Sequence, residues 1–67
     1  MSTMMYDLLP DQEWDGWRLQ KSGSQRAESI FLSKEMAMRL LPEATEGGCT
    51  VLIRDMQGRV ESSVILD

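Results

Sequence analysis

The sequence contains no histidine, only one cysteine and no long apolar run, and each shortage excludes a class of protein. Without histidine, the chain lacks the commonest general base of enzymes. The lone Cys49 can form neither an intrachain disulfide nor a zinc site of the usual four-ligand kind. No stretch approaches the roughly 18 apolar residues that a membrane-spanning helix needs. Because the first residues include neither a basic segment nor a long apolar one, we do not expect a signal peptide.

Basic residues are also scarce, and acidic charge is unevenly distributed. The formal net charge is -4: residues 1–16 hold four acidic residues and no basic one, whereas residues 17–67 balance seven acidic with seven basic residues. An acidic chain with a neutral body has no electrostatic reason to seek nucleic acid or an anionic membrane. Together with the shortage of cysteine, this distribution favours a cytoplasmic protein.

Groups with the chemistry of an active site are not evident in the sequence. Carboxylates are plentiful, but none forms a pair that must share a cleft, and a chain of 67 residues is expected to be too small for the usual pocket of roughly 300–1,000 Å3. The glycines at 22–24 and 46–48 lack the context of a phosphate-binding loop. Cys49 is interpreted either as a small buried strand residue or as a reactive thiol. We therefore expect no enzyme activity, no cofactor and no metal.

Residues 1–13 are predicted to be a flexible acidic N-terminal tail, and residues 14–67 a single domain. The first segment mixes Met, Ser and Asp with Pro10 and shows no lasting hydrophobic period. Chain termini are poorly ordered unless they are tied down. Tyr6 and Leu8 could dock on the body, so the choice between a free tail and a docked one stays open.

Two β-hairpins are predicted, one on each side of a helix. Residues 16–20 alternate apolar with polar side chains, residues 26–31 form a second strand, and the Gly and Ser between them suit a hairpin loop. Residues 49–54 and 59–66 form the second pair of strands. A type I turn from Asp55 to Gly58 joins them.

The helix is predicted to begin after Ser33, whose hydroxyl can accept an orphan backbone N–H. Glu35 falls in the first turn, where the helix dipole favours negative charge. Apolar residues recur at helical spacing in Met36, Ala37, Leu40, Leu41 and Ala44. Pro42 disfavours a continuous helix, so the helix either ends near residue 41 or restarts with Pro42 in a first turn. Gly47 and Gly48 end the segment in both cases.

The expected fold is therefore α+β, a single ββαββ domain with an antiparallel sheet and one helix packed on one face. Because side chains alternate along a strand, each hairpin has an apolar face and a mixed face. The apolar face and the helix supply the expected core: Trp17, Leu19, Ala27, Phe31, Val51, Ile53, Val60, Val64 and Leu66, covered by Met36, Leu40 and Leu41.

The opposite face of the predicted sheet is mostly polar but includes three large aliphatic side chains. Cross-strand ion pairs are expected between Arg18 and Glu28 and between Arg54 and Glu61. Two interpretations stay open: scattered surface apolar residues, which are normal, or a small partner-binding patch ringed by charge. In the second case, the candidate partner surface consists of Arg18, Ile30, Leu52, Arg54 and Ile65.

Three local patterns occur together in this chain. They are Gly16-Trp17-Arg18-Leu19 followed by Lys21, Gly23 and Arg26-Ala27; the capped helix start Ser33-Lys34-Glu35-Met36-Ala37; and Gly58-Arg59-Val60. The combination resembles a small bacterial domain family of unknown function with a GW-x-V-x-(K/R)-x-G-x-x-(R/K)-A opening and a DGR(I/V) hairpin. The resemblance covers about residues 15–62. It implies a compact hairpin–helix–hairpin domain and brings no activity with it.

Protein–protein interaction is the function class that these features favour. Small size, a mixed sheet face, two free sheet edges and six methionines suit a non-enzymatic interaction or regulatory module, with a homodimer as its simplest form. The alternative is a nucleic-acid-binding module with Trp14 or Tyr6 as a stacking platform. Its basic residues would come from the two hairpins: Arg18, Lys21, Arg26, Arg54 and Arg59.

Overall fold

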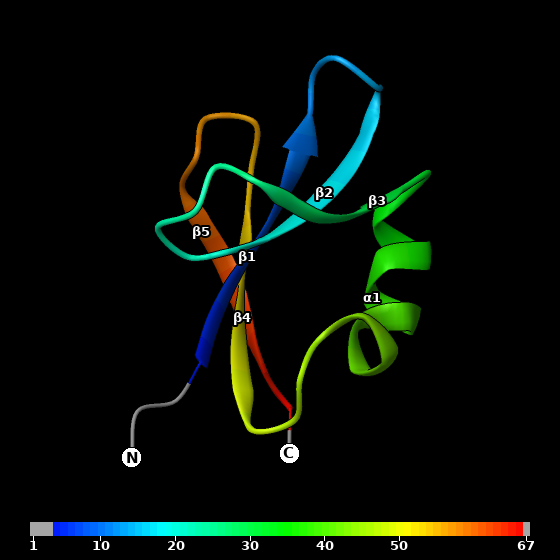
Figure 1. The fold of residues 1–67 in the computed structure, drawn as a ribbon. Coiled ribbons are helices and arrows are strands. Elements are labelled where there is room, and N and C mark those ends of the chain that lie inside the picture. Colours follow the sequence, from blue (N-terminus) through cyan, green and yellow to red (C-terminus); the bar gives the residue numbers. More distant parts are fainter. Residues whose placement is uncertain (1–3, 67) are drawn as a thin grey trace.

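The computed structural model describes residues 4–66, which form five strands and one helix (Figure 1). In chain order the elements are β1 (Met4–Asp11), β2 (Gly16–Lys21), β3 (Ala27–Phe31), α1 (Lys34–Ala44), β4 (Cys49–Arg54) and β5 (Val60–Leu66). Within the described part of the chain, no helix has the length and apolar character needed to cross a membrane.

The strands form one sheet in the order β3-β2-β1-β4-β5, with β1 at its centre (Figure 1). β1 runs antiparallel to β2 and parallel to β4, and the two outer pairs are antiparallel. The prediction of a small α+β domain with one helix is confirmed. The ββαββ order and the wholly antiparallel sheet are wrong, because β1 lies between the two hairpins and makes the sheet mixed.

β1 is the element that the sequence did not predict. The expected flexible tail at 1–13 is wrong for residues 4–11, while residues 1–3 lie outside the described residues. Tyr6 and Leu8 are buried at 2% and 0% exposure, so this strand is tied down by the core. Pro10 has no backbone N–H to donate, yet it is compatible with a central strand. The pairing of β1 with β4 already ends at Leu8 and Ile53, so β4 has no carbonyl beside Pro10 that lacks a donor.

Both predicted hairpins are confirmed, with turns that match the sequence signals. Gly23 and Gly58 have φ values of 85° and 84°, which only glycine adopts without cost. In the second turn the N–H of Gly58 donates to the carbonyl of Asp55 at 3.0 Å. The Asp55 carboxylate also accepts the backbone N–H groups of Gln57 and Arg59, at 2.8 and 2.9 Å, and so fixes the turn from inside.

The predicted start of the helix is confirmed, but its end differs from both alternatives. Ser33 Oγ accepts the N–H of Met36 at 3.1 Å. The helix continues through Pro42 and ends at Ala44, because Thr45 caps it: its N–H and its hydroxyl both donate to the carbonyl of Leu41, at 3.0 and 2.8 Å. The predicted break at Pro42 is therefore wrong.

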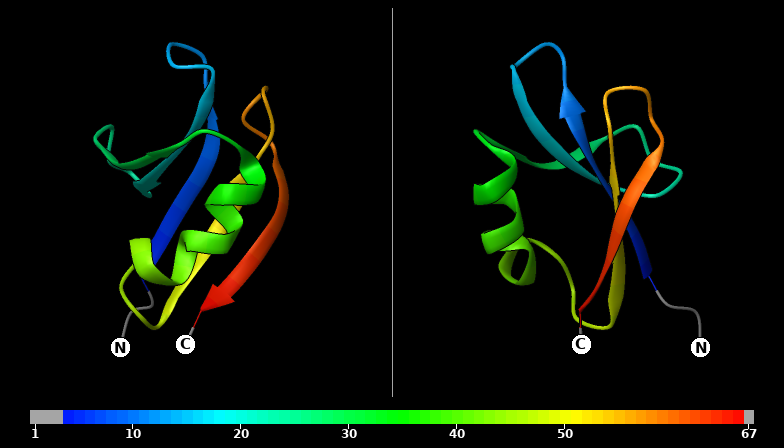
Figure 2. Two further views of the ribbon diagram at one scale, coloured as in Figure 1. Left: turned by 90° about the vertical axis from the view of Figure 1, so that its right-hand side faces the viewer. Right: turned by 180° about the vertical axis from the view of Figure 1, so that it is seen from behind.

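The core lies between α1 and one face of the sheet, which α1 crosses diagonally (Figure 2). Five predicted members are buried, namely Leu19, Phe31, Leu41, Val51 and Ile53, and Tyr6, Leu8, Ala37 and Cys49 complete the core. Trp17, Leu40, Val64 and Leu66 are partly buried against it. Cys49 is fully buried, which supports its interpretation as a small core residue over a reactive thiol.

Two predicted core residues are exposed, and each has a local reason. Val60 is 49% exposed, because the β4–β5 register shifts between Ile53 and Arg54 and pairs Val60 with Arg54 on the other face. Met36 is 38% exposed, because the neighbouring Ala37 is the first-turn side chain that α1 buries against the sheet.

Candidate functional site

The face of the sheet opposite α1 has no covering element among the described residues (Figure 2). We call it the open face. Three cross-strand rows and the pair Arg54–Val60 make it up, as the strand registers define them; the rows are Ile30–Arg18–Leu9, Gln20–Asp7–Leu52–Ser63 and Met5–Thr50–Ile65. Each row places aliphatic side chains beside polar ones, so this surface is mixed across its whole width.

All five predicted partner-surface residues lie on the open face, but not as one patch. Ile30 is on edge strand β3 and Ile65 on edge strand β5, and four strand spacings, roughly 19 Å across the sheet, separate these two strands. Leu52 and Ile65 are diagonal neighbours on β4 and β5, whereas β1 and β2 separate them from Ile30. The structure thus brings Leu52 and Ile65 together and moves Ile30 away.

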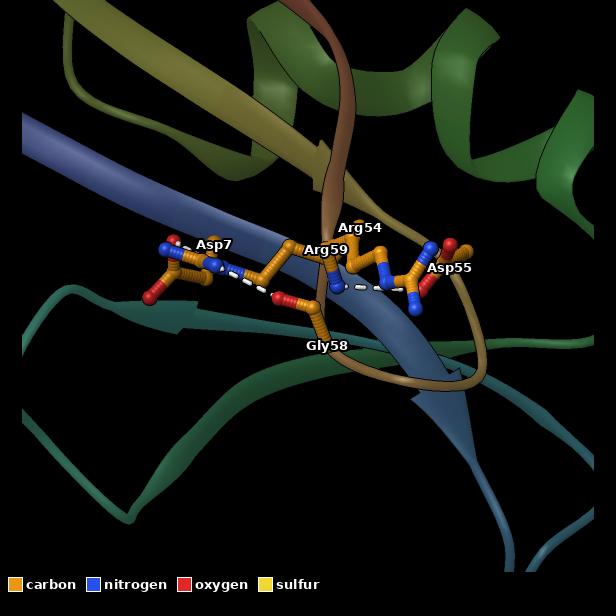
Figure 3. A network of polar contacts seen from close by, with 5 residues as sticks. All are labelled: Asp7, Arg54, Asp55, Gly58 and Arg59. Atoms are coloured by element: carbon orange, nitrogen blue, oxygen red, sulfur yellow. Dashed lines mark hydrogen bonds and ion pairs between the residues drawn. The ribbon is translucent and has the colours of Figure 1, made fainter.

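Asp7 and Arg54 form the polar centre of the open face (Figure 3). Arg54 Nε lies 3.1 Å from Asp7 Oδ1, with the two side chains 30% and 12% exposed, and Arg54 Nη1 donates to the carbonyl of Gly58 at 2.8 Å. The pair joins the two parallel strands and ties them to the β4–β5 turn. Because the Arg54 guanidinium donates both to Asp7 and to Gly58, it serves mainly to order this part of the open face.

The ion pairs expected from two isolated hairpins are not the ones that form. Arg54 is paired with Asp7 rather than Glu61, because β1 lies beside β4. Glu28 lies 3.7 Å from Lys21 Nζ instead of pairing with Arg18. The Arg18 guanidinium donates through Nη2 to the carbonyl of Gln25 at 3.0 Å, and its buried Nε has no hydrogen-bond partner among residues 4–66.

Strand β5 forms one edge of the sheet and is the most exposed strand. Residues 60–63 and Ile65 are exposed, with Ile65 at 76%. Natural edge strands are usually blunted by lysine, proline, a short length or a bulge. β5 has neither lysine nor proline in its seven residues, although its register shift at the Arg54 end provides one bulge. The stretch from Ser62 to Leu66 is therefore a regular, unblocked edge.

A cleft of about 390 Å3 opens at the end of the sheet where β1 and β4 both finish. It lies between the β1–β2 turn and the β4–β5 turn, which diverge at the same end of the sheet in Figures 1 and 2. The expectation that so small a chain holds no cleft of this size is wrong. The lining residues are Pro10, Asp11, Gln12, Asp15, Gly16, Trp17, Asp55, Met56 and Glu61. We call this feature the fork.

The lining of the fork combines an aromatic and a thioether side chain with carboxylates from both turns and no basic residue. Asp11 is 8% exposed and its Oδ1 accepts the N–H groups of Glu13 and Trp14, at 2.9 and 3.4 Å. Asp15 has a φ of 55°, a conformation that aspartate tolerates better than most residues. Within residues 4–66, no group of three or more His, Cys, Asp or Glu side chains is placed to hold a metal ion.

Lys34, the first residue of α1, lies outside this lining but contacts two of the lining residues. Its Nζ lies 5.5 Å from the centre of the Trp17 ring and 3.7 Å from Glu61 Oε1. The sequence shows all three residues, but only the fold shows that they meet. Helix α1 brings Lys34 over β2, and the bulge in β5 allows Glu61 to reach the helix side of the sheet.

The residues suggested for nucleic-acid binding are dispersed. Tyr6 is 2% exposed, so it cannot serve as a stacking platform. Trp14 is 70% exposed, but it lies in the turn that holds Asp11, Glu13 and Asp15. Arg18 and Arg54 already donate to partners within the domain.

The comparisons with known proteins give no further guide. No protein-family model, no curated protein and no solved structure matches the chain. The resemblance to a small bacterial domain family stays a prediction.

Proposed function

We propose that this chain is a small, non-enzymatic protein-interaction or regulatory module that associates with a second copy of itself through the β5 edge. The observation that carries the proposal is the unblocked stretch Ser62–Leu66, next to the exposed Ile65 and Leu52 side of the open face. Exposed edges of this kind accept another strand by main-chain hydrogen bonding. The cytoplasmic location expected from the sequence stays a prediction.

A second copy suits this edge because the pairing brings no like charges face to face. In an antiparallel pair centred on Ser63, Ser62 faces Val64 of the other copy and Glu61 faces Ile65, so the only charge of the strand does not oppose itself. The other edge is less suitable. β3 has five residues, follows a register shift in β2, and has the Lys21–Glu28 ion pair on its surface.

The test is the molar mass by light scattering behind size exclusion, over a range of protein concentrations at low and high salt. The proposal predicts a concentration-dependent dimer that persists at high salt, because main-chain and apolar contacts are weakly screened. A monomer at every concentration would contradict self-association.

Two matched variants identify the edge. Ile65→Lys places a charge on β5, and Ile30→Lys makes the same change on the opposite edge strand, at a residue that is also exposed. We expect Ile65→Lys to be monomeric and Ile30→Lys to dimerise like the parent. A dimer that only Ile30→Lys disrupts would refute the β5 edge.

Nucleic-acid binding remains the alternative proposal, with less support. Its basic residues are spread over the open face and the turns, and the net charge of -4 opposes it. Binding of this kind would weaken steeply with salt. Retention of a fluorescent single-stranded oligonucleotide at low salt, lost at high salt, would favour it over self-association.

A further inference from the structure

We propose that the fork binds a basic side chain, that of lysine or arginine, from another polypeptide. This site shares Glu61 with strand β5 but otherwise lies outside the Ser62–Leu66 edge, and it does not depend on dimer formation. Carboxylates alone would not define it. The inference rests on a cleft of about 390 Å3 in which two lining residues, Trp17 and Glu61, already contact an ammonium group, that of Lys34, from outside the lining.

The shape of the fork suits an elongated side chain with a charged end. The two turns lie at the same end of the sheet (Figures 1 and 2). Residues from both turns line the cleft, which is partly open. Pro10, Trp17 and Met56 supply apolar surface for the methylene stem. Lysine and arginine bury such stems while their charged ends stay near polar groups.

The charge of the fork is of one sign on both sides. Asp11 and Asp15 come from the first turn, and Asp55 and Glu61 from the second turn and β5, with no basic residue in the lining. The negative potentials of like charges on facing walls add in the space between them. A cation that enters the cleft is therefore attracted from both turns.

The contacts of Lys34 indicate that Trp17 and Glu61 are the lining residues that would bind a basic group. Its ammonium group approaches the Trp17 ring and Glu61 together, at 5.5 and 3.7 Å, which is the combination of π face and carboxylate that favours a cation. The Lys34 side chain is 42% exposed, so it is not locked in place. A basic group from a partner would compete with Lys34 for Trp17 and Glu61.

The test is an NMR titration of the full chain with an end-blocked peptide, Gly-Lys-Gly-Lys-Gly, followed through the indole N–H of Trp17 and the backbone amides of residues 11–16 and 55–58. The control peptide has both lysines acetylated, which removes the charge and keeps the stem. We expect saturable shifts with the first peptide and none with the second. Equal shifts with both peptides, or shifts spread evenly over the acidic surface, would overturn the proposal.

Lys34→Met sharpens the test, because it removes the internal competitor. The matched control is Arg39→Gln, which removes the same charge from an exposed position of α1 away from the fork. We expect Lys34→Met to bind the lysine peptide roughly two- to five-fold more tightly and Arg39→Gln to bind it like the parent. An equal gain in both variants would mean that only net charge matters and would refute the role of Lys34.

Glu61→Gln tests the carboxylate that would bind the basic group. We expect it to weaken binding of the lysine peptide by roughly two- to five-fold, whereas Glu43→Gln, the same change on an exposed residue of α1, leaves binding unchanged. Unchanged binding in Glu61→Gln would contradict the site. The molar mass of both variants should match the parent, which separates this result from failure of the dimer proposal.

Discussion

The two faces of the sheet differ in what their side chains do. On the face that α1 covers, Tyr6, Leu8 and Leu19 are at most 2% exposed and pack into the core. On the open face, Ile30 and Ile65 are 48% and 76% exposed, and the most buried residue is a charged one, Asp7. The covered face therefore determines stability, while the open face and the sheet end leave side chains free for contact with other molecules.

The central strand and the edge strand β5 differ in the same way. β1 is paired on both sides, and three successive residues, Tyr6, Asp7 and Leu8, are buried in it. β5 is paired on one side, and five of its seven residues are exposed. Substitutions in β1 should unfold the domain, whereas substitutions in β5 should change its association.

The largest effect is expected for Leu8→Ala, which would break the covered face at its centre. Leu8 is 0% exposed, and truncation of such a leucine costs about 2–5 kcal/mol in the free energy of unfolding. Leu32→Ala is the matched control, because Leu32 is 82% exposed and should change the free energy by less than about 0.5 kcal/mol. Urea denaturation at one protein concentration measures both. Equal losses would show that β1 is not central to the core.

Asp7→Asn tests the buried carboxylate that pairs with Arg54 on the open face. The substitution keeps the size of the side chain but leaves Arg54 without its charged acceptor, so we expect a loss of roughly 1.5–3 kcal/mol. Glu28→Gln removes a charge from the exposed Lys21 pair and should cost less than about 1 kcal/mol. If the two variants are equally stable in urea, the Asp7–Arg54 pair does not hold β1 and β4 together.

Gly16→Ala tests the close approach of β2 and the end of β3. A Cβ at residue 16 would lie 2.4 Å from the carbonyl oxygen of Phe31, so backbone must shift. We expect a loss of roughly 1–3 kcal/mol, as for other overpacked sites. Ser22→Ala, at an exposed position of the adjacent turn, is the control. A Gly16→Ala variant with the melting temperature of the parent would contradict this explanation of the glycine that opens β2.

The smallest effect on stability is expected for Ile65→Lys, even though it should abolish the dimer. Because Ile65 is 76% exposed, the monomer should unfold within about 0.5 kcal/mol of the parent when both are measured at high dilution. A loss of several kcal/mol in the free energy of unfolding would mean that Ile65 stabilises the fold as core residues do. The open face would then not differ from the covered face in its effect on stability.

The sequence predicts the hairpins and the helix because their signals are local. Alternation in Trp17 and Leu19, a capping serine at 33 and glycines at 23 and 58 each act within a few residues, and the structure confirms each of them. The length of the helix was harder to predict, because Pro42 weakens it locally and Thr45 compensates three residues later.

The central strand and the fork depend on contacts that are distant in the sequence. Asp7 looks like a solvent-facing residue until Arg54, 47 positions later, pairs with it. The fork needs two turns, 40 residues apart, to meet at one end of the sheet, and this follows only from the parallel pairing of β1 with β4. Two isolated hairpins would contain neither the Asp7–Arg54 pair nor the fork.

The most direct test of the β5 edge is backbone amide hydrogen exchange at low and high protein concentration. In a monomer, alternate amides of β5 point away from β4 and should exchange quickly. We expect these amides, within Ser62–Leu66, to become protected as the concentration rises, while the outward amides of β3 do not. Exchange in β5 that is independent of concentration would contradict the proposal that this edge pairs with a second copy.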